Sequence, residues 1–527
     1  MSRDFQLPGR SPIIAGEGMA ATSHPLASLA AIETLRAGGN AADAAVTAVA
    51  VLCVVEPHMT GIGGDCFAMV SVPGKPVWGY NGSGRAGARA SLEALMAQGI
   101  ATIAADSVHA VTVPGAIDTW AAILSAHGRL SLDRALAPAI RYAAGGFPVA
   151  ARIAWDWAQM VGKLSADIGA ARHFLFDGQA PAEGDIVRLP ALAQTLATIA
   201  AKGPRAFYEG AIAQDMVATV AVRGSFLTAE DFGNHRGAVV APITTNYRGL
   251  DVLELPPNTQ GLTALMLLNI LERFDLAALD PLGPDRFHIA LEAARLAYAV
   301  RDAHIADPAS MRVSVPALLD KGFAASLAGR VDRERRVAVP RAPAPDSDTV
   351  YLTVVDRDRM VVSLINTLFS SFGAGICTER TGIMLTNRGA CFVADPDHPN
   401  AFGASKRPMH TIIPALACRD GRCGLTFGVM GAHYQPMGHG QFVTNIVDYG
   451  MDVQAAIDAP RAFFVGERTV VERGLPRVSA DGLSARGHDV AIAPSPWGGA
   501  QAIRIDWERG VLIGGSDPRK DGCALGY

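Results

Sequence analysis

Thr349 is a residue of this 527-residue chain that could act as a nucleophile and supply its own base. It follows the stretch RVAVPRAPAPDSD at 336–348, whose prolines, small residues and acids are typical of an exposed, cleavable loop. Cleavage between Asp348 and Thr349 would leave a free α-amino group, whose pKa of ~7.7–8.0 makes it partly neutral near pH 7. That amine could take the proton from the Thr349 hydroxyl, directly or through water. The alternative is a β-branched residue that simply opens a strand.

Other catalytic signatures are missing from the sequence. There is no P-loop, no H-E-x-x-H pair and no G-x-S-x-G nucleophile motif. The glycine-rich run at 61–64 lacks the lysine and the spacing of a phosphate-binding loop and favours a tight turn. Cys418 and Cys423 stand apart from other ligand candidates, and the 13 histidines are dispersed. We therefore expect neither a metal ion nor an organic cofactor.

The composition restricts the class of protein and of partner. The 46 basic and 50 acidic residues nearly cancel, which argues against a nucleic-acid binder. No apolar run reaches the ~18 residues of a membrane-spanning helix, so we expect no membrane association. The first residues, MSRDFQLPGRSP, lack the apolar core of a secretory signal. With seven cysteines, an odd number, we expect reduced thiols and a cytoplasmic location.

The elements that would position Thr349 are predicted from periodicity and caps. Residues 25–37 have helical spacing and end at a glycine pair, and Asn40 is placed to cap a second helix through Val55. Residues 116–330 are mostly helical by pattern. The alternating, β-branched stretch at 349–367 predicts a hairpin. Together these elements predict a mixed α/β fold with sheets covered by helices.

Ordered motifs along the chain resemble the γ-glutamyltransferase (γ-glutamyltranspeptidase) family of N-terminal-nucleophile hydrolases nearly end to end. They include GGNAADAAV at 38–46, VVEPHMTGIGGD at 54–65, TVYLTVVD at 349–356 and GGSDPRKDG at 514–522. The resemblance implies a four-layer αββα sandwich made by one chain that cuts itself. It further implies a large subunit, 1–348, and a small subunit, 349–527, which together form one core as a heterodimer; a dimer of such heterodimers is the alternative.

The resemblance also implies a set of catalytic residues. Thr349 matches the family nucleophile, and Thr367 matches the threonine that orients it. Gly431 and Ala432 match the glycine pair whose backbone N–H groups form the oxyanion hole. Alanine at the second position still supplies an N–H group, so this function can survive.

The positions that hold the γ-glutamyl group in the family are different in this chain. Loss of one partner of a buried charge pair costs ~2–5 kcal/mol, so two such losses should nearly abolish recognition of that group. The differences are Asn81 for the arginine that clamps the α-carboxylate, Phe369 for an asparagine, Arg388 for a glutamine, Cys391 for the aspartate that binds the α-ammonium, and His410 with Thr411 for a serine pair.

These differences suggest a different substrate. Arg388 and His410 could bind an anionic group, and Phe369 fills volume. We therefore expect a self-processing amidohydrolase that acts on a small anionic amide such as oxamate. The chain is similar to the oxamate amidohydrolase branch of the family, and the glutaryl-cephalosporin acylase branch is also similar. One alternative is a γ-glutamyl hydrolase or transpeptidase that acts on glutathione-type compounds through a rebuilt pocket. Another is an uncleaved, non-catalytic binding protein on the same scaffold.

Overall fold

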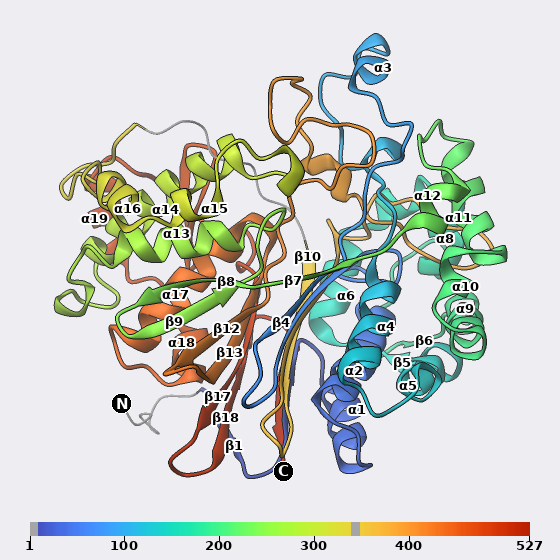
Figure 1. Cartoon of the computed structure of the whole chain (residues 1–527), viewed down its shortest axis with the longest axis horizontal. Helices are drawn as coiled ribbons and strands as arrows, with labels where there is room; N and C mark the ends of the chain where they lie inside the picture. Colours follow the sequence, from blue (N-terminus) through green and yellow to red (C-terminus); the bar gives the residue numbers. More distant parts are fainter. Residues whose placement is uncertain (1–8, 339–347) are drawn as a thin grey trace.

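Two antiparallel sheets of seven strands each pack face to face and form the centre of the molecule (Figure 1). This is a computed structural model, and it describes residues 9–338 and 348–527. One group of helices covers the outer face of each sheet, so the chain forms four layers in the order helix, sheet, sheet, helix. The αββα sandwich that the family resemblance implied is thereby confirmed.

The first sheet contains Thr349 near the start of one of its central strands. Its order is β19-β2-β10-β11-β3-β4-β7, and all its pairings are antiparallel. The strands are β2 (Met19–Thr22), β3 (Asp65–Ser71), β4 (Trp78–Asn81), β7 (Ala238–Val240), β10 (Asp348–Val355), β11 (Val361–Phe369) and β19 (Cys523–Gly526).

The second sheet has the order β1-β18-β17-β13-β12-β9-β8. Both sheets contain strands from before and after residue 348, so the two parts of the chain share one core. The strands are β1 (Ile13–Ala15), β8 (Ile243–Tyr247), β9 (Leu250–Glu254), β12 (Ala415–Arg419), β13 (Arg422–Met430), β17 (Gly499–Asp506) and β18 (Val511–Ser516).

The helices fall into two groups, one for each sheet. Helices α2 and α4 lie against the first sheet, and α13, α17 and α18 lie against the second. Beside the first sheet are α1 (Pro25–Arg36), α2 (Ala41–Val55), α4 (Ala116–His127), α5 (Leu132–Gly145), α6 (Ala151–Ala158), α7 (Val161–Ser165), α8 (Ile168–Phe174), α9 (Pro190–Lys202), α10 (Arg205–Tyr208), α11 (Ala211–Ala221) and α12 (Ala229–Asn234). Beside the second are α13 (Gly261–Leu271), α14 (Pro284–His304), α15 (Val315–Leu319), α16 (Lys321–Ala328), α17 (Gln435–Val447), α18 (Val453–Asp458) and α19 (Arg477–Ala485).

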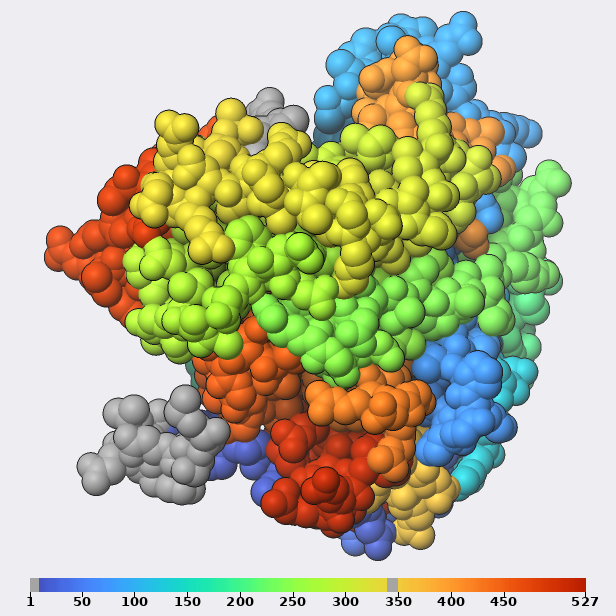
Figure 2. All heavy atoms as spheres, turned by 60° about the vertical axis from the view of Figure 1, so that its left-hand side comes forward, coloured from blue at the N-terminus to red at the C-terminus, as the bar shows by residue number. Residues whose placement is uncertain are grey.

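The remaining elements are short. A small cluster of buried side chains joins the chain near residue 100 to the chain near residue 400, and these blue and orange segments lie side by side at the top of Figure 2. The short elements are α3 (Leu92–Ala97), β5 (Phe147–Pro148), β6 (Ile186–Val187), β14 (Ala462–Val465), β15 (Arg468–Val471), β16 (Asp489–Ile492) and the 3₁₀ turns η1 (Val108–Ala110), η2 (Leu276–Ala278), η3 (Pro308–Ser310), η4 (Arg388–Cys391) and η5 (Ala432–Tyr434).

The first two helices confirm the prediction made from caps. Helix α1 ends at Arg36, just before the glycine pair, and Gly38 takes the left-handed backbone angle φ of 95° that suits glycine. Asn40 caps α2, and the Asp43 carboxylate accepts the Asn40 backbone N–H in return. These local signals fix where α2 enters the core, in which all fifteen of its residues are buried.

The hairpin predicted at 349–367 is also confirmed, as β10 and β11. By contrast, residues 238–254 were predicted within a mostly helical region but form the strands β7, β8 and β9. Their β-branched residues, and a turn at Gly249 with φ of 83°, favour strands once a sheet edge is available to pair with them. The predicted exposed loop at 336–348 lies largely outside the described residues.

Two further expectations concern the membrane and the thiols. No helix within the described ranges is long and apolar enough to cross a membrane. All seven cysteines are free thiols, as expected. The Cys418 and Cys423 thiols face each other across the β12–β13 hairpin, where these two residues are paired in register.

Candidate active site

Thr349 lies at an irregularity in the β10–β11 ladder. Asp348 pairs with Phe369 and Val350 pairs with Asn366, so the register shifts at Thr349. A bulge of this kind re-aims a side chain that regular pairing would place differently. The Thr349 hydroxyl oxygen lies 3.1 Å from the hydroxyl oxygen of Thr367, and both residues are fully buried. The structure thus brings together the nucleophile and orienting threonine that the sequence suggested.

The backbone after Thr367 fixes its hydroxyl. The Phe369 N–H donates to the Thr367 hydroxyl oxygen at 2.8 Å. Phe369 has a φ of 81°, a backbone region that a bulky residue rarely adopts. This turn directs the Phe369 N–H back at Thr367, so the hydroxyl beside Thr349 has little freedom to rotate.

The expected oxyanion pair lies where β13 ends and α17 is about to begin. Gly431 has a φ of 112° and Ala432 a φ of 47°, so both residues are in the left-handed region. An added Cβ on Gly431 would lie 3.0 Å from the Gly498 Cα, so a larger residue would push the neighbouring loop away. Ala432 keeps its backbone N–H but adopts a conformation that is unfavourable for alanine.

A buried glutamine holds this loop from behind. The Gln260 amide nitrogen donates to the Ala432 carbonyl at 2.7 Å and to the Thr411 carbonyl at 2.6 Å. Arg301, on α14, donates to the Gln260 carbonyl oxygen at 2.8 Å, which fixes the orientation of the amide. Arg301 also contacts the His433 ring nitrogen at 3.1 Å. The loop at 431–433 is therefore held by side chains from the large N-terminal part of the chain.

A cavity of about 250 Å³ lies next to this loop. Phe369 and Cys391 form one wall, and Arg301 and His433 form another. Burial raises the pKa of the Cys391 thiol, so it stays neutral. The remaining lining residues are Asp302, Ile305, Ala390, Val393, His398, Asn400 and Met409.

Arg388 lies directly behind that wall and is fully buried. Its guanidinium carbon is 3.9 Å from the centre of the Phe369 ring, and one nitrogen donates to the Thr411 hydroxyl at 2.8 Å. The same nitrogen is 3.6 Å from the Cys391 sulfur. The Nε and Nη2 atoms have no partner among the described residues. Burial lowers the pKa of this guanidinium, but an arginine still stays charged, so two charged donors are left unpaired.

Asp65 is the carboxylate that interacts electrostatically with Arg388, but it already has other hydrogen-bond partners. Asp65 accepts the Gly84 N–H at 2.8 Å and contacts the His410 Nε2 atom at 3.0 Å. Burial, together with the Arg388 charge, lowers the pKa of His410 to about 3, so this histidine is neutral. His410 is therefore uncharged and directed at Asp65, which leaves Arg388 as the candidate anion partner.

Asn81 is held in a polar cluster of its own. Its side-chain oxygen accepts from the Ser83 N–H at 3.0 Å and the Ser83 hydroxyl at 2.7 Å, and its nitrogen donates to Asn258 at 2.8 Å. It lines neither the 250 Å³ cavity nor the second cavity beside the 431–433 loop, which is described below. Of the residues suggested by the sequence, the structure brings Thr349 and Thr367 together. A second group around Arg388 contains Phe369, Cys391 and Thr411. Asn81 contacts neither group.

Several residues of the site were not singled out from the sequence. Asp65 lies inside the quoted motif at 54–65, and Arg301 lies in the region 116–330 that was predicted to be mostly helical. Gln260 has no recognisable signal, because its partner Ala432 is 172 residues away. No group of three or more His, Cys, Asp or Glu residues able to hold a metal ion occurs within 9–338 and 348–527.

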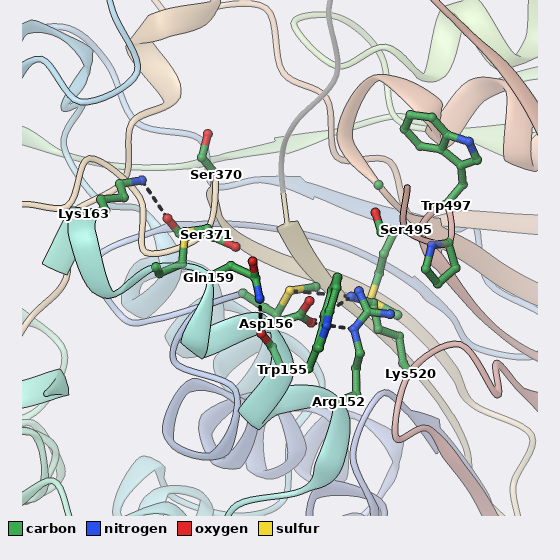
Figure 3. Close-up of a pocket in the computed structure, with 16 residues that line it drawn as sticks. Arg152, Trp155, Asp156, Gln159, Lys163, Ser370, Ser371, Ser495, Trp497 and Lys520 are labelled. Atoms are coloured by element: carbon green, nitrogen blue, oxygen red, sulfur yellow. Dashed lines mark hydrogen bonds and ion pairs between the residues drawn. The ribbon is translucent and has the colours of Figure 1, made fainter. Parts of the chain in front are cut away.

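A second, larger cavity of about 400 Å³ borders the same loop at Gly431 (Figure 3). Gly431 and Met430 line it, as do Ser370 and Ser371. In Figure 3, Arg152, Trp155, Asp156, Gln159 and Lys163 come from α6, α7 and the turn between them, whereas Ser495, Trp497 and Lys520 come from the C-terminal part of the chain.

The four-layer fold and the threonine at a strand start define an N-terminal-nucleophile hydrolase. The chain is similar over its full length to a cephalosporin acylase structure from Bacillus halodurans, with a TM-score of 0.94, 38% identity, and coverage of 100% of this chain and 99% of that one. The gamma-glutamyltranspeptidase family model matches residues 27–527, so the chain belongs to this family.

Two curated relatives show the range of activities in this family. The chain is 39% identical to the glutathione hydrolase-like YwrD proenzyme of Bacillus subtilis (strain 168), over 98% of this chain and 99% of the relative. It is 35% identical to the oxamate amidohydrolase proenzyme of Klebsiella pneumoniae subsp. pneumoniae, with the same coverage. Members of the family are hydrolases of amide bonds, and this chain is an enzyme of that kind.

Proposed function

We propose that this protein cleaves itself at Asp348–Thr349 and then hydrolyses the amide bond of a substrate whose acyl part is short and anionic. The large subunit would be 1–348 and the small subunit 349–527. Both sheets contain strands from both subunits, which supports a heterodimer that stays associated after cleavage.

Thr349 would perform both reactions. In self-cleavage its hydroxyl attacks the Asp348 carbonyl, and the acyl group moves from the Thr349 nitrogen to its oxygen, which forms an ester and frees the α-amino group; water then hydrolyses the ester and releases the Asp348 carboxylate and the Thr349 hydroxyl. In catalysis that amine takes the hydroxyl proton as the oxygen attacks the substrate carbonyl, and the proton passes to the leaving amine. The Gly431 and Ala432 N–H groups would stabilise the oxyanion. Water then hydrolyses the acyl-threonine ester and frees the carboxylic acid. Besides the substrate and water, each step uses groups of this chain.

The observation that carries the choice of substrate is the unpaired guanidinium of Arg388. A buried charge without a partner is costly, and a carboxylate is the group that best matches a guanidinium. In the uncut chain the Phe369 ring and Cys391 separate Arg388 from the smaller cavity. Rotation of the Phe369 side chain would open the guanidinium to an acyl group that ends in a carboxylate.

The alternative is action on γ-glutamyl compounds, as the name of the 39% identical relative suggests for that protein. A γ-glutamyl group carries an α-ammonium, which needs an acidic partner. Here the corresponding position is the neutral Cys391 thiol, 3.6 Å from the positive Arg388. Repulsion from that guanidinium favours an acyl group without the ammonium.

Cleavage is tested first, on a denaturing gel with intact mass, beside Thr349→Ala. We expect fragments of about 36 and about 19 kDa, in proportion to their share of 55.0 kDa, which are absent in the variant. A single uncut chain without turnover would support a non-catalytic binding protein instead.

Substrate choice is tested with glutaryl-p-nitroanilide and γ-glutamyl-p-nitroanilide, which differ only by the α-ammonium group, and with oxamate as the shortest anionic amide. We expect a kcat/KM for the glutaryl compound at least about tenfold higher, as follows from one unpaired charge beside a guanidinium. The reverse order, with acceleration by glycylglycine, would favour the γ-glutamyl alternative.

A further inference from the structure

Two of the seven cysteines form a pair at the exposed end of the β12–β13 hairpin. Cys418, on β12, lies directly opposite Cys423, on β13. Residues that face each other on antiparallel strands have Cα atoms about 4.5–5.5 Å apart. This range lies within the ~4.4–6.8 Å that a disulfide bond spans. The backbone therefore places the two thiols where a bond can join them without moving either strand.

The turn between the two strands fixes this pairing. Asp420 has a φ of 52° and Gly421 a φ of 74°, so both residues of the two-residue turn are in the left-handed region. Turns of this kind, for which Asp-Gly is a preferred sequence, match the twist of the flanking strands and set the register of a hairpin. Arg419 pairs with Arg422 beside the turn, so the next pair along the hairpin is that of the two cysteines.

Both thiols face the core between the two sheets, but they lie one residue away from solvent. Each of the two cysteines is 7% exposed, and residues 419–422 of the turn are all exposed. A Cβ added to Gly424 would have no heavy atom within 4 Å, so the space beside Cys423 is open. Three other cysteines are at most 2% exposed, namely Cys53, Cys66 and Cys377. A small reagent therefore has better access to the hairpin pair than to those three thiols.

A hydrogen bond between the two thiols makes them unequal. The Cys423 thiol donates to the Cys418 sulfur, which lowers the pKa of the Cys418 thiol, although burial and Asp251 act in the opposite direction. The same hydrogen bond and burial raise the pKa of Cys423 well above its usual value, although the Ser71 hydroxyl opposes the rise. The thiolate is the nucleophile in thiol–disulfide exchange, so Cys418 is the attacking thiol and Cys423 the resolving one.

We propose that Cys418 and Cys423 form a redox site, which exchanges with small-molecule disulfides and closes to an intrachain disulfide bond. The Cys418 thiolate attacks one sulfur of the small disulfide, forms a mixed disulfide with it and releases the other half as a thiolate. Cys423 gives its proton to a released thiolate and attacks the Cys418 sulfur, which frees the second half as a thiolate. The proton that Cys418 lost completes the second small thiol. Two protein thiols are thus oxidised, and one small disulfide is reduced to two thiols.

The bond would close the end of the hairpin that lies away from the candidate active site. Strand β12 begins shortly after Thr411, and β13 ends at Met430, next to Gly431. Along an extended strand, Cys423 and Gly431 are roughly 27 Å apart. The bond would therefore hold β12 and β13 in register without contact to the catalytic groups. The pair would be open in reducing surroundings and closed in oxidising ones, and it needs neither self-cleavage nor turnover to react.

The test treats the purified, native protein with bis(2-hydroxyethyl) disulfide, which contains no amide bond and so is not itself a substrate for hydrolysis. The remaining thiols are then alkylated, and the protein is digested with trypsin without reduction. Trypsin cuts after Arg419 and Arg422, between the two cysteines, so only a disulfide bond keeps their two peptides together. We expect this linked pair as the main intrachain product, and dithiothreitol should separate it.

Single variants separate the roles of the two thiols. Cys423→Ser should keep a hydroxyethylthio group on Cys418, because no resolving thiol is left to displace it. Cys418→Ser should react at Cys423 at least about tenfold more slowly, because Cys423 holds its proton more strongly. Cys523→Ser is the matched control, since it removes a half-buried thiol on β19, and it should give the same linked peptides as the wild type.

The wild-type digest decides the assignment without any variant. If the reagent reacts to completion and the linked peptides are missing, or if mixed disulfides remain on both Cys418 and Cys423, the pair is two packed thiols and the redox site is refuted. Equal rates of reaction in Cys418→Ser and Cys423→Ser would overturn the order of attack.

Discussion

The Gln260 side chain donates a hydrogen bond to the Ala432 carbonyl at 2.7 Å, and so holds the loop whose N–H groups would bind the oxyanion. The same amide nitrogen donates to the Thr411 carbonyl, and the Thr411 hydroxyl accepts from Arg388. One buried amide therefore connects the loop that would bind the oxyanion to the segment that contacts the candidate carboxylate partner. An oxyanion hole works only if its donors are fixed before charge develops, which gives Gln260 a positioning role.

Gln260→Met should lower kcat with little change in KM for the glutaryl substrate. The loop at 431–433 would lose its support from behind, and donors displaced by about 1 Å cost roughly 100-fold in rate. Stopped assays on processed protein give both constants. Gln194→Met is the control, because Gln194 is exposed on α9 and has no place in the site. A rise in KM with kcat intact would contradict the positioning role.

Arg388→Met should abolish recognition of the anionic acyl group without lowering stability. Loss of the charge should reduce kcat/KM for glutaryl-p-nitroanilide by roughly 30- to 4000-fold, which corresponds to ~2–5 kcal/mol for an ion pair. The free energy of unfolding should stay equal or rise, because the uncut chain no longer buries a guanidinium with two unpaired nitrogens.

Arg388→Lys is the matched variant, since it keeps the charge but not the two parallel donors, and it should retain part of the activity. Thermal unfolding of all three proteins, made uncut by Thr349→Ala, measures stability. A large loss of stability in Arg388→Met with normal activity in its processed form would mean that Arg388 has a structural role only.

Ala432→Gly should be tolerated in activity and should not destabilise the protein. Ala432 has a φ of 47°, and a left-handed conformation costs an alanine about 1–2 kcal/mol relative to the usual region. Glycine removes that cost but gains freedom in the unfolded chain, about 0.4–1 kcal/mol, so the net gain in stability is about 0–1.6 kcal/mol.

Ala432→Val provides the contrast, because a β-branched residue fits this region poorly and should impair both cleavage and turnover. Gel densitometry of processing and kcat of processed protein report the two effects. If Ala432→Gly lost most of its activity, the Ala432 methyl group rather than its N–H would be required at the site.

What could be predicted from the sequence depended on how local the signal was. The Asn40 cap and the hairpin after Thr349 were predictable because caps and alternation act over a few residues. Thr367, the partner of Thr349, was found only through the family resemblance. The stack of Phe369 on Arg388, and the neutral state of His410 beside Asp65, depend on contacts that no spacing in the sequence reveals.

The larger cavity could not be predicted from the sequence for the same reason. Arg152 and Trp155 come from α6, and Gly431 and Trp497 come from segments more than 270 residues further along the chain. Each residue by itself is an ordinary surface cation, aromatic residue or glycine. Only the packing of α6 near the end of β13 and the 495–498 segment makes them one site.

The Glu56 carboxyl, at the end of α2, should make stability depend on pH between about 4.5 and 7. Burial raises its pKa from 4.5 to about 7, although His58, the Ser23 hydroxyl and Lys520 act in the opposite direction and Asp521 adds to the rise. The Ser23 hydroxyl donates to this carboxyl at 2.8 Å. Below pH 4.5 the group is protonated in both the folded and the unfolded chain. Above that pH the unfolded chain loses the proton first, so stability falls as pH rises until the folded carboxyl also ionises near pH 7.

Glu56→Gln removes this titration and should be more stable than the parent protein at pH 8 by roughly 2–4 kcal/mol relative to their difference at pH 4.5. Denaturant unfolding at several pH values, in the Thr349→Ala background so that one intact chain unfolds, measures the two free energies. Glu33→Gln on the exposed face of α1 removes a carboxyl without a buried environment and should show no such trend. If the difference in unfolding free energy between Glu56→Gln and its parent instead narrowed as pH rises, Glu56 would be ionised in the folded chain. The effects of Lys520 and His58 on its pKa would then outweigh the effect of burial.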